Sequence, residues 1–317
     1  MLLTIAIPTY NRAPYLEQCL RALIASIEEA HEAVEVIVIS NASPDHTAEV
    51  VAKAAQAYPI SFVTNERNIG ANRNIAKATR MGGGEYIWVL GDDDYPTKDC
   101  VPRLVALLRQ KPDFVILNFD NYLPDAKRYC GKKWFALRRD KALAGPNASM
   151  RYLGASAGFT SCVVAKRRIL TSLTEAEEKE WSATGFNQLY AFYRGLPSGC
   201  AGVVTDEVLL YTSHASGNGV DFEWNDYFLD GLGKIFRQLR TEGKYTAVAV
   251  NTARLEVVNR SVSRRLITLK IAGIGCREFA LNSVRTFGFV TLLSPRFLAG
   301  LVTPTRIFKA WRARAIT

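Results

Sequence analysis

Three consecutive acids, Asp92-Asp93-Asp94, are the residues of this 317-residue chain that most clearly suit a chemical role. Neighbouring carboxylates repel one another, and a divalent cation such as Mn²⁺ or Mg²⁺ relieves that repulsion by accepting oxygen ligands. Such a cation can also bridge carboxylates to the phosphate oxygens of a bound diphosphate. The triplet therefore indicates a site for metal and phosphate. The alternative interpretation is a solvated acidic turn that caps the next helix.

The sequence lacks the two glycine-rich loops that commonly hold phosphates. No G-x-G-x-x-G follows the first predicted strand, and no G-x-x-x-x-G-K-[ST] occurs anywhere in the chain. These absences disfavour dinucleotide-binding and P-loop proteins. A divalent cation held by carboxylates then remains as the way to bind a diphosphate.

The elements that must position the acids alternate regularly over the first 120 residues. Apolar β-branched runs predict strands, and apolar positions with helical spacing predict helices between them. The predicted strands are 2–8, 34–39, 60–64, 85–90 and 114–119, and the predicted helices are 14–30, 47–58, 70–81 and 102–109. This order predicts an α/β fold with a mainly parallel sheet flanked by helices. Further strands are expected at 161–165 and 203–211, and a helical, basic tail from about residue 226.

Polar residues follow each of the first four predicted strands. In an open parallel sheet the carboxyl ends of the strands form one edge, and ligands bind there. The residues at that edge are Thr9-Tyr10-Asn11-Arg12, Ser40 to Asp45, Asn65 to Gly70 with Arg73-Asn74, and Gly91 to Asp94.

These strand ends resemble the motifs of the family 2 glycosyltransferases of the GT-A fold. The resemblance covers about residues 3–120, and its four motifs occur in the family's order and spacing: Pro8 to Arg12, Ser40 to Thr47, Asn68-Ile69-Gly70 with Arg73-Asn74, and Gly84 to Asp94. It implies a metal-dependent, inverting enzyme that moves one sugar from a nucleotide-sugar donor to a glycan acceptor. In bacterial members that build O-antigen or capsule, the acceptor is commonly lipid-linked.

The resemblance also implies roles for individual residues. The expected donor-binding residues are Pro8, Thr9, Tyr10, Arg12, Ser40, Asn41, Asn68, Arg73 and Asp92. Asp93 is the expected main ligand of Mn²⁺ or Mg²⁺, with Asp94 assisting and His214 as a further ligand from a later loop. The family usually has Asp at the position of Ser40, so the resemblance does not specify the nucleotide base.

No motif marks the catalytic base. Inverting members carry an acid, often a Glu-Asp pair that opens a helix in the acceptor half, whereas the corresponding stretch 181–188 contains no acid. A single displacement still needs a base for the acceptor hydroxyl proton. The nearest candidates, in order of preference, are Glu180, Asp206 and Glu178. The alternative interpretation of the acids at 175–180 is a solvated helix face.

The net charge of +10 belongs to the C-terminal tail. From Arg260 onward there are eleven basic residues and one acid, while the rest of the chain holds 29 of each sign. Basic residues among leucines and aromatics suit a helix that lies on an anionic membrane surface. The alternatives are a helical subdomain packed on the body and a dimer interface. We divide the chain into a nucleotide-sugar-binding half (1–120), an acceptor-binding half (121–225) and a helical region (226–317) that can associate with membrane.

The expected location is the cytoplasm, peripheral at the inner face of the cell membrane. Six cysteines are scattered singly, which fits reduced thiols, and the first residues lack the basic segment of a signal peptide. The apolar stretch 286–303 is interrupted by Pro295 and Arg296, so no membrane span is expected. The expected partners include no nucleic acid, because the body of the chain carries no excess charge.

Two other functions compete with sugar transfer. A sugar-phosphate nucleotidyltransferase would use the same fold, but its glycine-rich basic signature does not follow the first strand. A non-catalytic scaffold that binds nucleotide-sugar and has a membrane-binding tail would account for the missing acid in 181–188.

Overall fold

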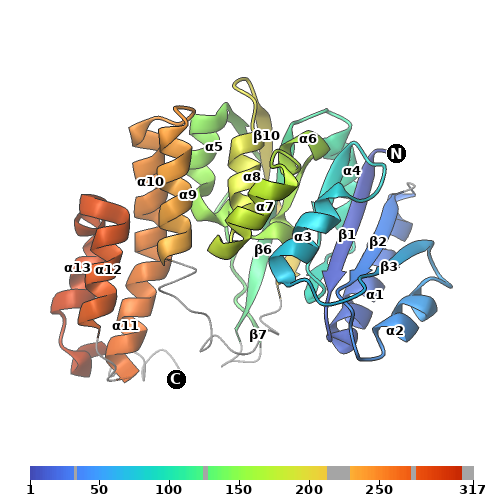
Figure 1. Ribbon diagram of the computed structural model, residues 1–317, viewed down its shortest axis with the longest axis horizontal. Coiled ribbons are helices and arrows are strands. Elements are labelled where there is room, and N and C mark those ends of the chain that lie inside the picture. The colour runs from blue at the N-terminus through green and yellow to red at the C-terminus, as the bar shows by residue number, and fades with distance from the viewer. Residues whose placement is uncertain (32–33, 124–127, 213–228, 273–275, 309–317) are drawn as a thin grey trace. The chain divides into compact units, whose positions relative to one another are not determined.

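The computed structural model describes residues 1–31, 34–123, 128–212, 229–272 and 276–308. The chain divides into two compact units. Within the described ranges, unit 1 comprises residues 1–146, 157–182 and 186–222, and unit 2 comprises residues 147–156, 183–185 and 223–317. Figure 1 shows the elements of both.

The first half of unit 1 alternates strands and helices, as the sequence predicts. Its elements are β1 (Leu3–Thr9), α1 (Ala13–Ala30), β2 (Glu35–Ser40), α2 (Thr47–Ala54), β3 (Ile60–Thr64), α3 (Ala71–Arg80), β4 (Tyr86–Val89), β5 (Asp94–Pro96), α4 (Cys100–Leu108) and β6 (Phe114–Leu123). The helix predicted for 47–58 ends at Ala54, because Pro59 restricts the preceding residue to extended backbone.

The second half of unit 1 is less regular and completes the sheet. Its elements are β7 (Arg128–Tyr129), β8 (Lys141–Ala144), η3 (Thr160–Cys162), β9 (Val163–Lys166), α6 (Arg167–Leu170), α7 (Glu175–Trp181), α8 (Asn187–Gly195) and β10 (Ala201–Thr212). The short 3-10 helices η2 (Gly154–Gly158) and η4 (Ser182–Thr184) link parts of the chain that belong to different units.

The sheet is mixed, with the parallel strands β1 to β4 on one side of the antiparallel strand β9. Its order is β3-β2-β1-β4-β9-β6-β10-β5, with β7 on β6 and β8 on β10. The strands β1 to β4 are parallel, and β9 runs antiparallel between β4 and β6. Because β6 and β10 run in the same direction as β4, their carboxyl ends join those of β1 to β4 at one edge. The expected α/β architecture is confirmed, with antiparallel strands added to the predicted sheet.

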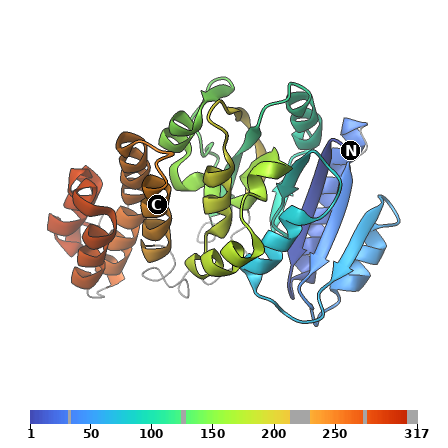
Figure 2. The ribbon, with the colours of Figure 1, turned by 45° about the horizontal axis from the view of Figure 1, so that its top comes forward.

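Helices cover both faces of this sheet. The helices α1, α2 and α4 pack together on one face, and α3, α6, α7 and α8 pack on the other (Figures 1 and 2). Buried aromatic side chains fill the interior, and their polar atoms are satisfied: Trp88 Nε1 donates to the Ser161 carbonyl at 2.7 Å. The strands β1 and β4 are buried almost throughout, as expected for a sheet covered on both faces.

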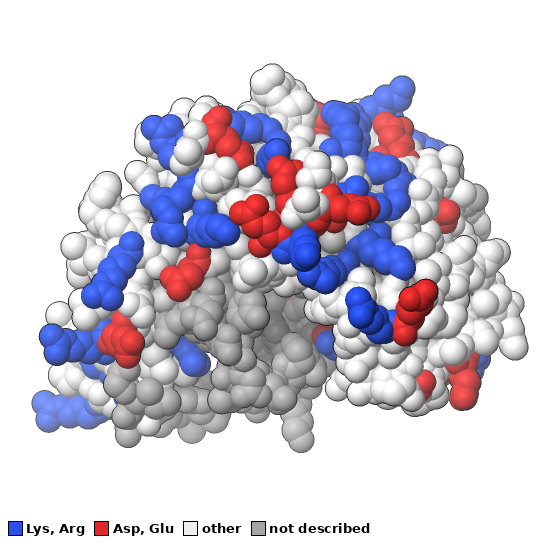
Figure 3. Space-filling model, in the orientation of Figure 1, with Lys and Arg blue, Asp and Glu red and all other residues white. Residues whose placement is uncertain are grey.

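Unit 2 is helical in its described residues. Its elements are α5 (Pro146–Leu153), α9 (Leu232–Thr241), α10 (Ala247–Val257), the π-helix η6 (Val258–Val262), α11 (Ser263–Ala272), α12 (Arg277–Phe287), η7 (Gly288–Leu293) and α13 (Pro295–Val302). On the face shown in Figure 3, blue Lys and Arg side chains lie over the region of α11 to α13, with red acidic atoms beside them. Within the described ranges, no helix has both the length and the apolarity needed to cross a membrane.

The contact between α6 and α8 depends on a glycine. A Cβ added to Gly195 would lie 2.2 Å from the carbonyl oxygen of Ile169, which is backbone and cannot move aside. We expect Gly195→Ala to lower the free energy of unfolding by about 1–3 kcal/mol, the usual cost of overpacking. Thermal denaturation measures this. The matched control is Gly199→Ala, because nothing lies within 4 Å of its added Cβ. Equal melting temperatures for the two variants would contradict this packing.

Candidate active site

An arginine from the first loop lies against the acids that follow β4. Arg12 Nε is 3.3 Å from Asp92, and Arg12 Nη2 is 2.5 Å from Asp93. The backbone places them together because β1 and β4 are adjacent parallel strands, so the residues after each strand meet at the same edge. The guanidinium also lies over the Tyr15 ring, 5.1 Å from its centroid. Burial lowers the pKa of Arg12, but the charges of Asp92 and Asp93 outweigh burial and raise it overall.

Asp92 is the most deeply placed member of this cluster, only 6% exposed. Its second oxygen accepts a hydrogen bond from the Thr9 hydroxyl at 2.7 Å. Burial raises the pKa of Asp92 to about 6, although Arg12 and the Thr9 hydrogen bond both act to lower it. At neutral pH a carboxylate with this raised pKa lowers the stability of the folded protein. Such groups are common where binding or catalysis requires them.

The third acid of the triplet contacts a serine from a later part of the chain. Asp94 accepts a 2.5 Å hydrogen bond from the Ser161 hydroxyl, and Ser161 in turn accepts one from the Gly91 amide at 2.9 Å. A Cβ on Gly91 would lie 2.8 Å from the Asp94 carboxylate and 3.1 Å from Ser161 Oγ. A side chain at position 91 would therefore displace the hydrogen-bonded pair of Asp94 and Ser161.

A network of asparagines fixes the loops after β2 and β3. Asn65 donates to the side-chain oxygens of both Asn41 and Asn74 at 2.9 Å. Asn41 donates to Asn68 at 2.8 Å and accepts from the Ile69 amide at 2.9 Å. Two of the expected donor-binding residues, Asn41 and Asn68, are thus engaged in shaping the loops. Asn65, buried in this network, was not among the sequence candidates.

The remaining expected donor residues lie at the same edge. Pro8 is half-buried near the end of β1, and Tyr10 is 42% exposed just beyond it. The Ser40 hydroxyl is 3.1 Å from the Ser43 hydroxyl, which accepts from the Asn11 amide at the same distance. Arg73 is exposed in the first turn of α3, and no described residue forms a hydrogen bond or ion pair with it.

The acids at this edge are oxygen ligands of the kind that Mn²⁺ and Mg²⁺ prefer. Asp92 and Asp93 approach the same guanidinium, so their carboxylates converge on one point. Among the described residues, however, no three His, Cys, Asp or Glu side chains form a ready-made metal site. The donor set therefore fits a cation that takes its other ligands from a bound phosphate or water. His214, the expected additional ligand, lies outside the described residues.

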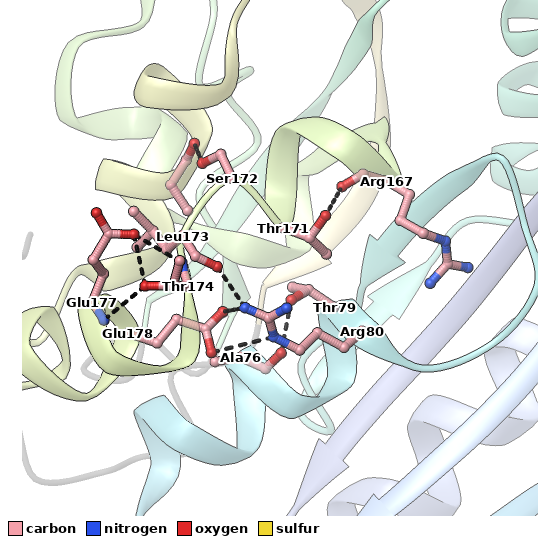
Figure 4. Close-up of polar contacts among 11 residues, drawn as sticks. Ala76, Thr79, Arg80, Arg167, Thr171, Ser172, Leu173, Thr174, Glu177 and Glu178 are labelled. Atoms are coloured by element: carbon pink, nitrogen blue, oxygen red, sulfur yellow. Dashed lines mark hydrogen bonds and ion pairs between the residues drawn. The ribbon is translucent and has the colours of Figure 1, made fainter.

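Glu178, one of the three base candidates, is engaged in a contact between helices. Arg80, the last residue of α3, pairs with Glu178 at 2.8 Å and donates to the Leu173 carbonyl at 2.6 Å (Figure 4). The start of α7 is fixed beside them by a capping box between Thr174 and Glu177. Because α3 begins at the carboxyl edge and runs back along the sheet, Arg80 and Glu178 lie toward the opposite edge.

The other two base candidates differ in position. Glu180 is exposed near the end of α7, two residues before Ser182. The Ser182 carbonyl accepts a 3.0 Å hydrogen bond from Asn72 in the first turn of α3, so this end of α7 faces the carboxyl edge. Asp206 lies six residues before Thr212 on β10, and Thr212 pairs with Asp94. The irregularity between Val204 and Val208 sets Asp206 roughly level with Leu117 of β6, so it lies about four residues, on the order of 13 Å, before that edge.

A further acid at the edge was missed by sequence reasoning. Asp120 follows the strand predicted at 114–119, is 5% exposed, and pairs in register with Tyr211 near the end of β10. Its carboxylate accepts hydrogen bonds from the amides of Gly131 and Lys132, at 2.8 Å and 3.4 Å. The signal was available, because Asp120 comes directly after a predicted strand, as the triplet does.

The comparison with known families identifies the chain's class. An α/β sheet with acids and an arginine at the carboxyl ends of its strands is the architecture of GT-A transferases. The family model described as "Glycosyl transferase family 2" matches residues 4–171. This range is more than half of the chain. The chain belongs to this family. The family expected from the sequence is confirmed.

Two curated bacterial proteins show the similarity in sequence. Abequosyltransferase RfbV of Salmonella typhimurium is 34% identical over 118 residues, which are 37% of this chain and 35% of the relative. An undecaprenyl-phosphate 4-deoxy-4-formamido-L-arabinose transferase of Pseudomonas savastanoi is 31% identical over 114 residues, which are 35% of this chain and 34% of the relative. The matches therefore span about a third of these relatives.

Solved structures share the fold over nearly the whole chain. S. aureus TarS 1–349 in complex with UDP-GlcNAc has a TM-score of 0.62 and 15% identity, and the match covers 99% of this chain and 92% of TarS. The mannosyltransferase PcManGT of Pyrobaculum calidifontis, in complex with GDP-Man and Mn²⁺, has a TM-score of 0.53 and 17% identity, covering 95% and 86%. At these identities the likeness shows a common fold.

The raised pKa of Asp92 predicts how stability changes with pH. Between pH 4 and pH 6 the folded protein holds a proton on Asp92 that the unfolded chain has lost, so stability falls as pH rises through this window. The variant Asp92→Asn has no ionisable group at this position, so its stability does not fall with pH for this reason. We expect the stability of the variant relative to wild type to increase by about 1–3 kcal/mol from pH 4 to pH 7.5, measured by denaturant unfolding without ligand.

Asp45→Asn is the matched control, and its stability relative to wild type should change with pH in the opposite direction. Burial of Asp45 acts to raise its pKa, but hydrogen bonds with Thr47 and the Ala13 amide outweigh burial and lower it. Asp45→Asn should therefore lose stability relative to wild type as pH rises from about 2 to 5. A stability difference for Asp92→Asn that stays constant with pH would contradict the burial argument.

Proposed function

We propose that this glycosyltransferase moves one sugar from a nucleoside diphosphate sugar to a hydroxyl of a lipid-linked glycan. The observation that carries the proposal is the convergence of Arg12, Asp92 and Asp93 at the carboxyl edge of a family 2 domain. An arginine beside two acids offers a cation for phosphate and ligands for a metal in one place.

The donor diphosphate is proposed to bind beside Arg12. Arg12 Nε and Nη2 are buried and lack a well-aligned hydrogen bond, although both lie at ion-pair distance from the acids. Asp93 would hold Mn²⁺ or Mg²⁺ with help from Asp92, and the bound ion would neutralise charge on the leaving diphosphate. Tyr10, exposed at the end of β1, is placed to pack on the nucleoside. Arg73 is placed to reach its base or phosphates.

Glu180 is the proposed base for a single displacement with inversion. The acceptor oxygen forms a bond to the anomeric carbon, while the bond from that carbon to the diphosphate oxygen breaks. The acceptor proton passes to the base, and the electron pair leaves with the diphosphate. Glu180 is favoured by its position, because α7 ends near the first turn of α3 at the carboxyl edge. Glu178 lies with Arg80 toward the opposite edge, and Asp206 lies before the carboxyl edge on β10.

The acceptor class is proposed from the relatives. One is an abequosyltransferase and another transfers a sugar to undecaprenyl phosphate, and both are bacterial. A lipid-linked acceptor is presented at a membrane surface, which suits a protein on the inner face of the cell membrane. The basic C-terminal sequence supports the same location.

The donor site can be tested by a thermal-shift panel of UDP, GDP, CDP, dTDP and NAD, each with and without Mn²⁺. At a concentration of 100 times Kd, a ligand stabilises the folded state by about 2.7 kcal/mol, a shift of roughly 5–10 °C. We expect one nucleoside diphosphate to give such a shift with Mn²⁺, and Asp93→Ala to abolish it. The matched control Asp99→Ala removes an exposed acid before α4 and should keep the shift.

Two results would count against this donor site. A shift that survives in Asp93→Ala would remove Asp93 from the metal site. No shift with any nucleotide would favour a scaffold that does not bind the donor through this edge.

The base can be identified by comparing two neighbouring glutamates. We expect Glu180→Gln to lower kcat by about 10²–10⁴-fold, because its exposed side chain acts on the acceptor. Glu178→Gln should lower the melting temperature, because it weakens the pair with Arg80, and should change kcat much less. Rates are measured as nucleotide release with saturating acceptor. The reverse pattern would assign the base to Glu178.

A further inference from the structure

We propose that unit 2 carries a surface that lies on an anionic lipid bilayer, made of one exposed apolar face with an arginine-lined groove beside it. The C-terminal apolar face comprises Phe289, Leu292 and Leu293 of η7 and Leu298, Leu301 and Val302 of α13. The arginine groove is lined by Arg151, Arg260 and Arg296. This inference concerns attachment to membrane and stands independently of the sugar-transfer chemistry.

The helix α13 buries a narrow stripe and exposes apolar residues beside it. Phe297 and Gly300 are buried, and Gly300 allows close packing, since its added Cβ would lie 3.1 Å from Leu266 of α11. Leu298, Leu301 and Val302 have the i, i+3, i+4 spacing of one helix face and are exposed by 41%, 38% and 80%. An amphipathic helix in a water-soluble protein normally buries such residues. Their exposure here indicates that this face binds a partner.

The end of α13 is fixed with this face outward. Lys270 of α11 donates to the carbonyls of Gly300, Leu301 and Thr303, at 3.0, 2.7 and 2.8 Å. These contacts satisfy carbonyls at the helix C-terminus, where a cation also suits the helix dipole. The exposed leucines therefore belong to a packed helix whose end is anchored to its neighbour.

The preceding segment η7 extends the apolar face. Phe289, Leu292 and Leu293 are exposed by 65%, 50% and 57%, while Val290 and Thr291 point into unit 2 and are buried. Together η7 and α13 supply six exposed large apolar side chains within 14 residues. Scattered single apolar residues are normal on a surface, but a group of this size marks an interaction site.

Charge identifies the partner as anionic. Glu278 is the last acid of the chain, and residues 279–317 contain six Lys or Arg and no Asp or Glu. A protein partner with a purely apolar surface would gain nothing from this bias, whereas an anionic leaflet attracts each basic residue near it. Leucines and a phenylalanine flanked by arginines are the composition of helices that lie in the membrane interface.

The groove offers positions for lipid phosphates. Its volume is about 590 Å³, and its three arginines come from α5, η6 and the start of α13. Arg260 is paired with Glu256 at 3.0 Å, so Arg151 and Arg296 are the cations to test. Pro295 and Arg296 line the groove at the start of α13, the helix that also carries Leu298, Leu301 and Val302. Headgroup phosphates at the groove would let the apolar face enter the leaflet beside them.

The test is flotation of the full chain with vesicles of phosphatidylcholine alone or of equal parts phosphatidylcholine and phosphatidylglycerol. We expect binding to the anionic vesicles that weakens with added salt, and little binding to the zwitterionic ones. Arg151→Gln with Arg296→Gln should weaken binding tenfold or more, since each basic residue near an anionic leaflet contributes about fivefold. Replacing Leu298, Leu301 and Val302 together with serine should weaken vesicle binding to a similar extent.

Matched controls separate the surface from general effects. Val248→Ser removes an apolar side chain of α10 that is 66% exposed, and Arg21→Gln removes an exposed cation of α1. Both should bind as wild type does, and the melting temperatures of all variants should agree. Equal binding to both vesicle types, or unchanged binding by the arginine variant, would overturn the proposal. So would a wild-type dimer that the serine variant dissociates, because a second copy would then cover the face.

Discussion

The candidate site depends on placing one guanidinium against two carboxylates at the end of a buried strand. Asp92 is nearly inaccessible to solvent, and a buried carboxylate without a partner is costly. Arg12 supplies that partner from the neighbouring strand end, and Thr9 supplies a hydrogen bond. Even so, burial prevails and the pKa of Asp92 is raised to about 6. The fold therefore keeps at this edge a carboxyl group whose charged form is disfavoured by burial.

The rest of the edge is arranged so that this cluster keeps its shape. Asp94 accepts a hydrogen bond from Ser161, and both side chains lie so close to Gly91 that a Cβ there would displace them. On the other side, the asparagine network around Asn41 and Asn65 fixes the loops after β2 and β3. Such buried polar networks specify a single loop arrangement because every unpaired member would be costly. Rigid supports of this kind suit a site that must align a donor with an acceptor.

The two units carry different physical properties. Unit 1 contains the sheet and the acids and arginine of the candidate site. Unit 2 contains the basic and acid-free C-terminal residues, with apolar side chains exposed on η7 and α13. Sugar transfer to a lipid-linked acceptor needs both chemistry and access to a membrane surface. In the two proposals above, the chemistry belongs to unit 1 and the membrane contact to unit 2.

The sequence alone was sufficient for the order of strands and helices, the α/β class and the polar residues at the strand ends. These follow from local periodicity and residue type, which are properties of neighbouring positions. Only the tertiary structure decided what each acid does. Asp94 is bound by Ser161, 67 positions away, and Glu178 by Arg80, 98 positions away, while Glu180 stays exposed. Such pairings depend on how strands and helices pack, and no pattern of neighbouring residues encodes them.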